Sequence, residues 1–400
     1  MSIHPRTRSV HAGRDDLARL GVHAPPIDLS STYPLRDLDR ATGSLDAMAH
    51  GEGPRHGEAV YARLHNPTVA RFETALAELE ECAEAVAFGS GMAAMTAVLM
   101  AAREDGDEIV AVRPLYGGSD HLLSGDLLGL TVRWTAADRV AATIGPRTAL
   151  VVLETPANPT LDLVDLDALV GAADGVPVLV DNTFATPVLQ RPAGHGARMV
   201  LHSATKFLGG HGDVVGGVVA TDSTWAARLR RVRVATGALL HPLAAYLLHR
   251  GLPTLGLRVE ASQETATALA ARLADHPSVR AVRHPSRPGA DPDGLVGRQM
   301  SGPGSLVTFD VDGGHEVAAT VMKSTRWFTP AVSLGSVDSL IQHPAGLTHH
   351  VVDPDARAAS GIGPQTLRIS VGLEHVDDLW ADLDSALRCA ADTRVRPVRV

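Results

Sequence analysis

Short apolar runs alternate with helical patterns through the middle of this 400-residue chain. The runs are apolar on both faces, which is typical of strands in a sheet that helices cover on both sides. Parallel strands need crossover connections, and the helical patterns between the runs can supply them. We therefore predict a largely parallel α/β sheet. Its strands are expected at residues 108–112, 148–153, 177–180, 199–201 and 214–220.

The length of the chain exceeds the size at which one hydrophobic core keeps growing, so a large and a smaller domain are expected. Residues 1–60 are rich in Pro, Gly and turn residues and show little apolar periodicity, which indicates an arm lying on another surface. A helix is predicted from Pro67. We therefore divide the chain into an arm (1–60), an α/β domain (61–250) and a smaller C-terminal α/β domain (251–400). In the last domain we expect helices at 261–274 and 376–390 and strands at 278–283, 305–311 and 366–371.

Charge and cysteine content exclude several classes of protein. The net charge is −9 without a block of like charges, which does not favour binding to nucleic acid or to an anionic membrane. The two cysteines, Cys82 and Cys389, cannot build a disulfide framework and lack metal-ligand spacing. No apolar run resembles a signal sequence or a membrane span. We expect a cytoplasmic protein.

Polar groups follow four of the predicted strands, where ligands bind in open α/β sheets. These segments are Tyr116-Gly117-Gly118, Glu154 to Pro159, Asp181-Asn182-Thr183 and Ser203-Ala204-Thr205-Lys206. The carboxyl ends of parallel strands meet at one edge, so the sequence predicts a single polar site there.

Lys206 is one of only two lysines, beside 34 arginines. A lysine amine can lose its proton and form a Schiff base with a carbonyl, which a guanidinium cannot do. Codon bias is the alternative explanation of this scarcity. Asp181, at the end of an apolar strand, needs a cationic partner. A protonated pyridine nitrogen would serve, since a pyridoxal cofactor needs both a lysine and such an acid. A structural ion pair of Asp181 with Lys or Arg is the alternative.

The segment Gly89-Ser90-Gly91-Met92 is a turn that opens a helix rich in Ala and Met. Free N–H groups at a helix start can bind a phosphate, and the hydroxyls of Ser203 and Thr205 could add donors. A plain turn is the alternative. No Gly-Lys-Ser/Thr of the Walker type occurs, which argues against a nucleoside triphosphatase.

Taken together, these segments resemble the fold-type I, pyridoxal-phosphate-dependent enzymes of Cys/Met metabolism, which include cystathionine γ-synthase, cystathionine γ-lyase and methionine γ-lyase. The resemblance covers nearly the whole chain, and its most specific segment is Ser203 to Asp213. Other matching segments are Tyr61 to Thr68, Ser90 to Met92, Tyr116 to Gly118, Glu154 to Pro159, Asp181 to Thr183, Ser333 to Gly335, His343 to Ala345 and Arg368 to Glu374. The family has a mostly parallel seven-stranded sheet in its large domain.

The resemblance implies a role for each matching residue. Lys206 would bind pyridoxal 5′-phosphate as a Schiff base and move protons, Asp181 would hold its ring nitrogen protonated, and Tyr116 would stack on the ring. The remaining cofactor-binding residues would be Ser90, Gly91, Met92, Ser203 and Thr205, with Tyr61 and Arg63 reaching the neighbouring subunit. A dimer with shared active sites would follow, and the family expectation is a tetramer built from two such dimers.

Arg368 lies inside a predicted strand, and its planar fork suits a substrate carboxylate. A structural salt bridge is the alternative. By the resemblance Arg368 binds the α-carboxylate with help from Asn158 and Ser333. A loose group of His343, His349, His350 and Asp353 fits no standard metal motif, and we expect no metal.

Two positions bear on the reaction. Methionine γ-lyases typically have Cys at the position of Gly118, where this chain resembles the cystathionine enzymes. Those enzymes usually carry Glu at the position of Val332, where this chain resembles methionine γ-lyase. We expect γ-elimination of methionine or cystathionine to 2-oxobutyrate, ammonia and a thiol. The alternatives are γ-replacement on an O-acylated homoserine, as in cystathionine γ-synthase, and a noncatalytic protein that binds the cofactor.

Overall fold

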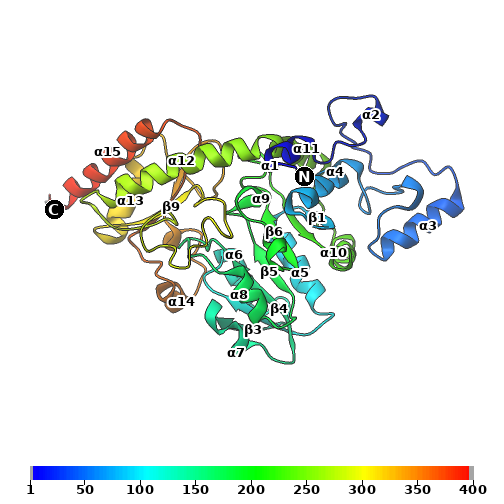
Figure 1. The fold of residues 1–400 in the computed structure, drawn as a ribbon, viewed down its shortest axis with the longest axis horizontal. Coiled ribbons are helices and arrows are strands. Elements are labelled where there is room, and N and C mark those ends of the chain that lie inside the picture. The colour runs from blue at the N-terminus through cyan, green and yellow to red at the C-terminus, as the bar shows by residue number, and fades with distance from the viewer. Residues whose placement is uncertain (1–2, 396–400) are drawn as a thin grey trace.

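The computed structural model describes residues 3–395 of the chain. Its centre is a seven-stranded sheet, drawn from cyan to green in Figure 1. The strands lie in the order β1 (Glu84–Phe88), β7 (Gly217–Thr221), β6 (Met199–Ser203), β5 (Val178–Asp181), β4 (Thr148–Glu154), β2 (Glu108–Val112) and β3 (Thr131–Thr135). Only β7 runs against its neighbours, and the other neighbouring pairs are parallel. The prediction of a mostly parallel sheet is confirmed.

The strands β1 and β3 were not expected from the sequence. The edge strand β3 is half-exposed and carries Arg133 and Trp134, so it lacks the apolar run that marks the central strands. The strand β1 follows directly on a helix and has only five residues. The strand β7 begins at Gly217, three residues later than predicted, because Val214 packs beyond the sheet in the core around helix α4 (Pro67–Glu80).

Two layers of helices cover this sheet. On one face α4 and α11 (Pro242–Gly251) enclose a core with Phe72 and Leu248. On the other face α5 (Gly91–Ala102) packs over β6 and β7, and α10 (Ser223–Thr236) packs over β1 and β7. The other helices of this part are α6 (Gly117–Ser124), α7 (Val140–Thr143), α8 (Leu166–Ala172) and α9 (Thr186–Leu189). Burial on both faces explains why the central strands are uniformly apolar.

The C-terminal part has its own sheet and core. Its five strands lie in the order β10 (Thr329–Pro330), β11 (Leu340–Gln342), β12 (Thr366–Ser370), β9 (Leu306–Val311) and β8 (Val279–Arg283). The accompanying helices are α12 (Leu255–Ala274), α13 (Gly314–Ser324), α14 (Pro354–Ala359) and α15 (Val376–Val395). The fold class expected from the sequence, a large and a smaller α/β unit, is therefore confirmed, while the domain boundaries remain a prediction.

The N-terminal segment has more structure than its composition indicated. Helix α1 (Pro5–His11) packs on the chain itself, with Arg6 paired to Glu260 of α12. Helices α2 (Leu17–Leu20) and α3 (Leu38–Ala49) project from the body of the molecule (Figure 1). The Asp37 side chain caps α3 by accepting from the Arg40 N–H, a local signal that the sequence analysis missed.

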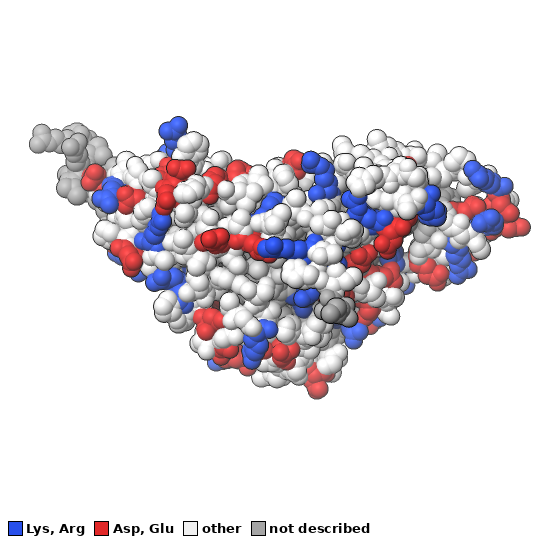
Figure 2. All heavy atoms as spheres, turned by 45° about the horizontal axis from the view of Figure 1, so that its top comes forward, with Lys and Arg blue, Asp and Glu red and all other residues white. Residues whose placement is uncertain are grey.

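Charges of both signs are interspersed over the face shown in Figure 2. Within residues 3–395, no helix combines the length and the apolar character that crossing a membrane requires.

Candidate active site

A cavity of about 560 Å³ opens at the carboxyl ends of β4, β5 and β6. Every predicted site residue except Tyr61 and Arg63 lines it. They are Ser90, Gly91, Met92, Tyr116, Gly118, Asn158, Asp181, Ser203, Thr205, Lys206, Val332, Ser333 and Arg368. These residues come from both sheets and from positions almost 280 apart in the chain. The fold thus gathers the expected side chains around one space.

Lys206 lies three residues beyond β6, and its Nζ donates a hydrogen bond of 2.7 Å to the Ser333 hydroxyl. Burial and, to a smaller extent, the nearby charge of Arg368 lower the pKa of this amine to about 8, although Asp181 acts in the opposite direction. About a tenth of the amine is therefore neutral at pH 7, far more than at an ordinary lysine. A neutral amine is the form that attacks a carbonyl.

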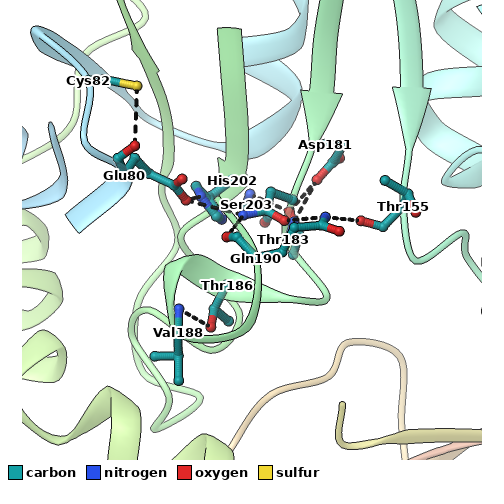
Figure 3. Close-up of polar contacts among 11 residues, drawn as sticks. Glu80, Cys82, Thr155, Asp181, Thr183, Thr186, Val188, Gln190, His202 and Ser203 are labelled. Atoms are coloured by element: carbon teal, nitrogen blue, oxygen red, sulfur yellow. Dashed lines mark hydrogen bonds and ion pairs between the residues drawn. The ribbon is translucent and has the colours of Figure 1, made fainter. Parts of the chain in front are cut away.

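Asp181 ends β5, and its Oδ1 accepts hydrogen bonds from the Thr183 N–H (3.0 Å) and hydroxyl (2.5 Å). The Thr183 hydroxyl also accepts from the Ser203 N–H at 2.9 Å, which links β5 to β6 (Figure 3). Burial raises the pKa of Asp181, against the effect of the Thr183 hydrogen bonds. Within residues 3–395, no hydrogen bond reaches Oδ2. The cavity therefore contains a buried carboxyl oxygen suited to a cationic ring nitrogen.

The N-terminus of α5 forms a second polar end of the cavity. The Ser90 hydroxyl caps the helix by accepting from the Ala93 N–H, and no described residue accepts from the N–H groups of Gly91 and Met92. A Cβ on Gly91 would lie 2.9 Å from the Cβ of Ser203, so only glycine allows this close approach. Free N–H groups beside the Ser203 hydroxyl suit a phosphate. The residues present thus fit both ends of pyridoxal phosphate.

Arg368 crosses the cavity wall from β12, where it is buried. Its guanidinium donates to the Asn158 Oδ1 at 2.7 Å and to the Ser333 carbonyl at 3.0 Å. Burial lowers its pKa to about 10, so it remains a cation at neutral pH. Ser333 has a φ of 94°, a rare conformation for a residue with a Cβ. Ser333 thus has a rare backbone conformation at the point where it contacts both Arg368 and Lys206.

Glu154 also lines the cavity, although the sequence analysis gave it no role. It ends β4 opposite Asp181 of β5, and its Oε2 accepts the Tyr116 N–H at 2.7 Å. Burial raises the pKa of Glu154 well above its usual range, and the neighbouring Asp181 raises it further. Glu154 thereby fixes the start of the helix that carries the Tyr116 ring. Its position at a strand end was a signal, as was that of Thr183 two residues after Asp181.

Part of the cavity lining is apolar and exposed. Val332 is 53% exposed and lines the cavity together with Leu347 and Val351, two residues that the sequence analysis missed. A Cβ on Gly118 would lie 2.6 Å from the Tyr116 ring and 3.2 Å from the Met92 sulfur. Gly118 therefore allows the ring of Tyr116 to take its present position.

Tyr61 and Arg63 do not line this cavity. They line a separate space of about 360 Å³ together with Arg233 and His241. The Arg63 guanidinium lies 5.5 Å from the centre of the Tyr61 ring and donates to the Val234 carbonyl. Within one chain these two residues therefore belong to a different surface from Lys206.

The histidines near the cavity have structural contacts. His349 is buried, and its Nε2 lies 3.1 Å from the Asn158 carbonyl. Burial lowers the pKa of His349 to about 4, so it is neutral at pH 7. In the part of the chain that the structure describes, no three His, Cys, Asp or Glu side chains form a metal-binding group.

The seven-stranded sheet and the cavity at its edge define the class of fold-type I pyridoxal-phosphate enzymes. The family of Cys/Met metabolism PLP-dependent enzymes matches residues 6–388. L-methionine gamma-lyase of Brevibacterium sandarakinum is 58% identical over 388 residues, covering 96% of this chain and 98% of that protein. L-methionine gamma-lyase of Brevibacterium aurantiacum is 56% identical, with coverage of 96% and 95%.

A solved structure of cystathionine gamma synthase from Xanthomonas oryzae pv. oryzae, in complex with aminoacrylate and cysteine, has a TM-score of 0.90 to this chain. Its sequence is 36% identical, and the match covers 98% of this chain and all of that one. The chain belongs to the Cys/Met metabolism PLP-dependent enzyme family. The expected family, fold and cofactor are therefore confirmed.

Proposed function

We propose that this enzyme is a carbon–sulfur lyase of the methionine γ-lyase type. The reaction converts methionine and water to 2-oxobutyrate, ammonia and methanethiol, so the Cγ–S bond breaks and the amine is lost. Two relatives that share 56–58% of their residues with the chain are L-methionine gamma-lyases, which supports this reaction.

The apolar, exposed part of the cavity lining is the observation that carries the substrate choice. The acidic residues that line the cavity, Glu154 and Asp181, are buried at the ends of β4 and β5, whereas Val332, Leu347 and Val351 are exposed and bring no charge. Cystathionine has a second amino and carboxyl group at its distal end, and methionine has only a methyl thioether. These apolar side chains offer no partner to the distal charges of cystathionine but can pack against the methyl thioether of methionine, so methionine fits better.

When bound, pyridoxal phosphate supplies a carbonyl carbon for an amine and a ring that accepts the electron pair from Cα. Asp181 Oδ2 would hold the ring nitrogen, and the N–H groups of Gly91 and Met92 with the Ser203 hydroxyl would hold the phosphate. Thr205 also lines the cavity. Its hydroxyl donates to the Gly216 carbonyl at 3.2 Å and accepts from the Gly216 N–H at 3.1 Å.

The protein groups orient the substrate and move its protons. Arg368, beside Asn158, would bind the α-carboxylate of the substrate. This binding would orient the substrate so that its Cα proton points toward Lys206. The Nζ of Lys206 would take up that proton and release it again, because its pKa of about 8 lies close to neutral pH. The Tyr116 phenol, at the open side of the cavity, would give a proton to the departing sulfur.

Tyr61 and Arg63 support a dimer with shared active sites, since neither lines the cavity of its own chain. In this proposal the N-terminal arm brings both residues to the cofactor phosphate of a neighbouring subunit. Mixing Arg63→Ala with Lys206→Ala subunits tests it. Random pairing would give about a quarter of the wild-type activity, because half of the dimers would contain one complete site out of two. No recovered activity in verified mixed dimers would contradict shared sites.

Product analysis tests the reaction itself. The purified enzyme is incubated separately with methionine, with cystathionine, and with O-acylated homoserine plus cysteine. We expect 2-oxobutyrate and methanethiol from methionine, with a higher kcat/KM than for cystathionine. Accumulation of cystathionine from the third mixture without 2-oxobutyrate would instead establish γ-replacement.

A further inference from the structure

Polar residues also lie next to the three cavity residues Glu154, Asp181 and Ser203, at the ends of β4, β5 and β6. These neighbours are Thr155, Asn182 and His202, and none of them lines the cavity. Side chains alternate along β6, so His202 points to the face opposite Ser203, where Glu80 of α4 contacts it. All three neighbours are buried. An apolar side chain in place of His202 or Asn182 would need no hydrogen-bond partner in this core, so their polarity requires another explanation.

A continuous chain of hydrogen bonds joins these residues. Glu80, the last residue of α4, places its Oε1 2.5 Å from the His202 Nε2 and 3.2 Å from the Asn182 amide nitrogen. The Gln190 amide donates to the Asn182 Oδ1 at 3.0 Å and to the Thr155 carbonyl at 2.9 Å. We call these five residues the rear chain, and Figure 3 labels four of them, Glu80, His202, Gln190 and Thr155.

The rear chain reaches the cavity through one peptide bond. The N–H of Ser203, the residue directly after His202, donates to the Thr183 hydroxyl at 2.9 Å. That hydroxyl donates to Asp181 at 2.5 Å. A change in the position of His202 therefore moves the hydrogen bonds of Asp181. Against the effect of burial, His202, behind the sheet, and Lys206, in the cavity, both lower the pKa of Asp181.

The rear chain is poorly explained by stability alone. Glu80 Oε2 and His202 Nδ1 are buried without a hydrogen-bond partner among the described residues. A buried polar atom without a partner is unfavourable, and an apolar pair of the same volume would avoid this penalty. Polar residues that persist in such a place are candidates for a role in shaping a neighbouring site.

We propose that His202, held by Glu80, is a positioning residue that sets the orientation and charge of Asp181 toward the cofactor. This rests on the proposed roles of Lys206 and Asp181. The imidazole fixes the peptide between residues 202 and 203, and the Ser203 N–H in turn fixes the Thr183 hydroxyl. That hydroxyl donates to Asp181 Oδ1 and so leaves Oδ2 free to face the cavity. The groups that face Asp181 are Lys206 and Glu154 around the cavity and His202 behind the sheet.

The test compares His202→Leu, which removes the ring nitrogens, with His202→Gln, whose amide nitrogen can replace Nε2. His276→Leu is the matched control, because His276 is also buried and pairs with Asp384 at 3.3 Å in the C-terminal part. For each variant we would measure the dissociation constant of pyridoxal phosphate, the pH midpoint of the cofactor absorbance band and the Tm of the cofactor-free protein. Lys206→Ala, measured alongside, should lack the band.

We expect His202→Leu to weaken cofactor binding by about tenfold, the effect of losing one charge-assisted hydrogen bond, and to shift the pH midpoint. His202→Gln should restore binding to within about threefold of the wild type. His276→Leu should lower only the Tm. A His202→Leu protein with a lowered Tm but wild-type binding and midpoint would overturn the proposal.

Glu80→Gln provides the test if His202→Leu does not fold, because it keeps the volume and an oxygen for Asn182. It should fold and shift the pH midpoint, and an unchanged midpoint would overturn the proposal. A wild-type protein without a cofactor band would instead refute the proposed function, so the two failures are distinguishable.

Discussion

The two faces of β4, β5 and β6 differ in how their polar groups are satisfied. On the rear face, the Glu80 to Thr155 chain joins amides, an imidazole and a carboxyl by hydrogen bonds, and two of its atoms lack partners. On the cavity face, burial shifts the pKa of Asp181, Glu154 and Lys206 toward the neutral form. The rear face holds the strands, and the cavity face keeps groups that only a bound cofactor or substrate satisfies.

Removing the reactive amine of the cavity face should have the largest effect. Lys206→Ala should lower kcat by about 10³-fold or more, because it removes both the attachment point and the proton carrier. Steady-state kinetics and the cofactor absorbance spectrum would measure this loss. Lys323→Ala is the control, since Lys323 lies in α13 and does not line the cavity. A Lys206→Ala enzyme with an unchanged spectrum would contradict the assignment.

The cofactor-free protein should become more stable when the buried amine is replaced. The pKa of Lys206 is about 8 in the folded state against an ordinary 10.5. Folding thus disfavours the protonated amine, and this lowers the free energy of unfolding. The loss is at its maximum below pH 8 and disappears as pH rises to 10.5. Lys206→Met should therefore stabilise the cofactor-free protein at pH 7 by on the order of 3 kcal/mol. Urea unfolding at pH 7 and pH 10.5 would measure the gain in the free energy of unfolding. An equal gain at both pH values would show that the lowered pKa of Lys206 is not its cause.

Removing the guanidinium from the C-terminal wall should act on substrate binding. Arg368→Leu is expected to raise the KM for methionine by about 10- to 100-fold, since a charge-assisted pair contributes about 1.5–3 kcal/mol. Arg368→Lys should recover part of the loss, because it keeps the charge without the fork. A Leu variant with wild-type KM would show that Arg368 is only a structural contact of Asn158.

The smallest expected effect concerns the apolar, exposed part of the cavity lining. Val332→Glu should raise the preference for cystathionine over methionine by about fivefold at most, because the residue is 53% exposed and solvent screens its charge. Val332→Gln adds similar volume without the charge and should leave the preference nearly unchanged. The ratio of kcat/KM values for the two substrates measures this, and equal effects of both variants would exclude an electrostatic cause.

Much of the site was predictable because its residues follow apolar strands. Lys206 and Asp181 were identified in this way, and both line the cavity. The resemblance to a family supplied Arg368, which alone could equally have been half of a salt bridge. Leu347 and Val351 were missed because a loop gives no periodic signal that it will lie over a distant sheet. Likewise β3 was missed because an exposed edge strand lacks the apolar pattern.

The sequence by itself determined which residues of β5 and β6 face the cavity, because side chains alternate along a strand. It also determined the chemistry at these strand ends, through the residue types themselves. Only the tertiary structure decided that Glu80 meets His202 across 122 positions of the chain. The same holds for Tyr61 and Arg63, which line a separate space and not the cavity of their own chain. Such pairings depend on how helices pack on the sheet, which no local pattern encodes.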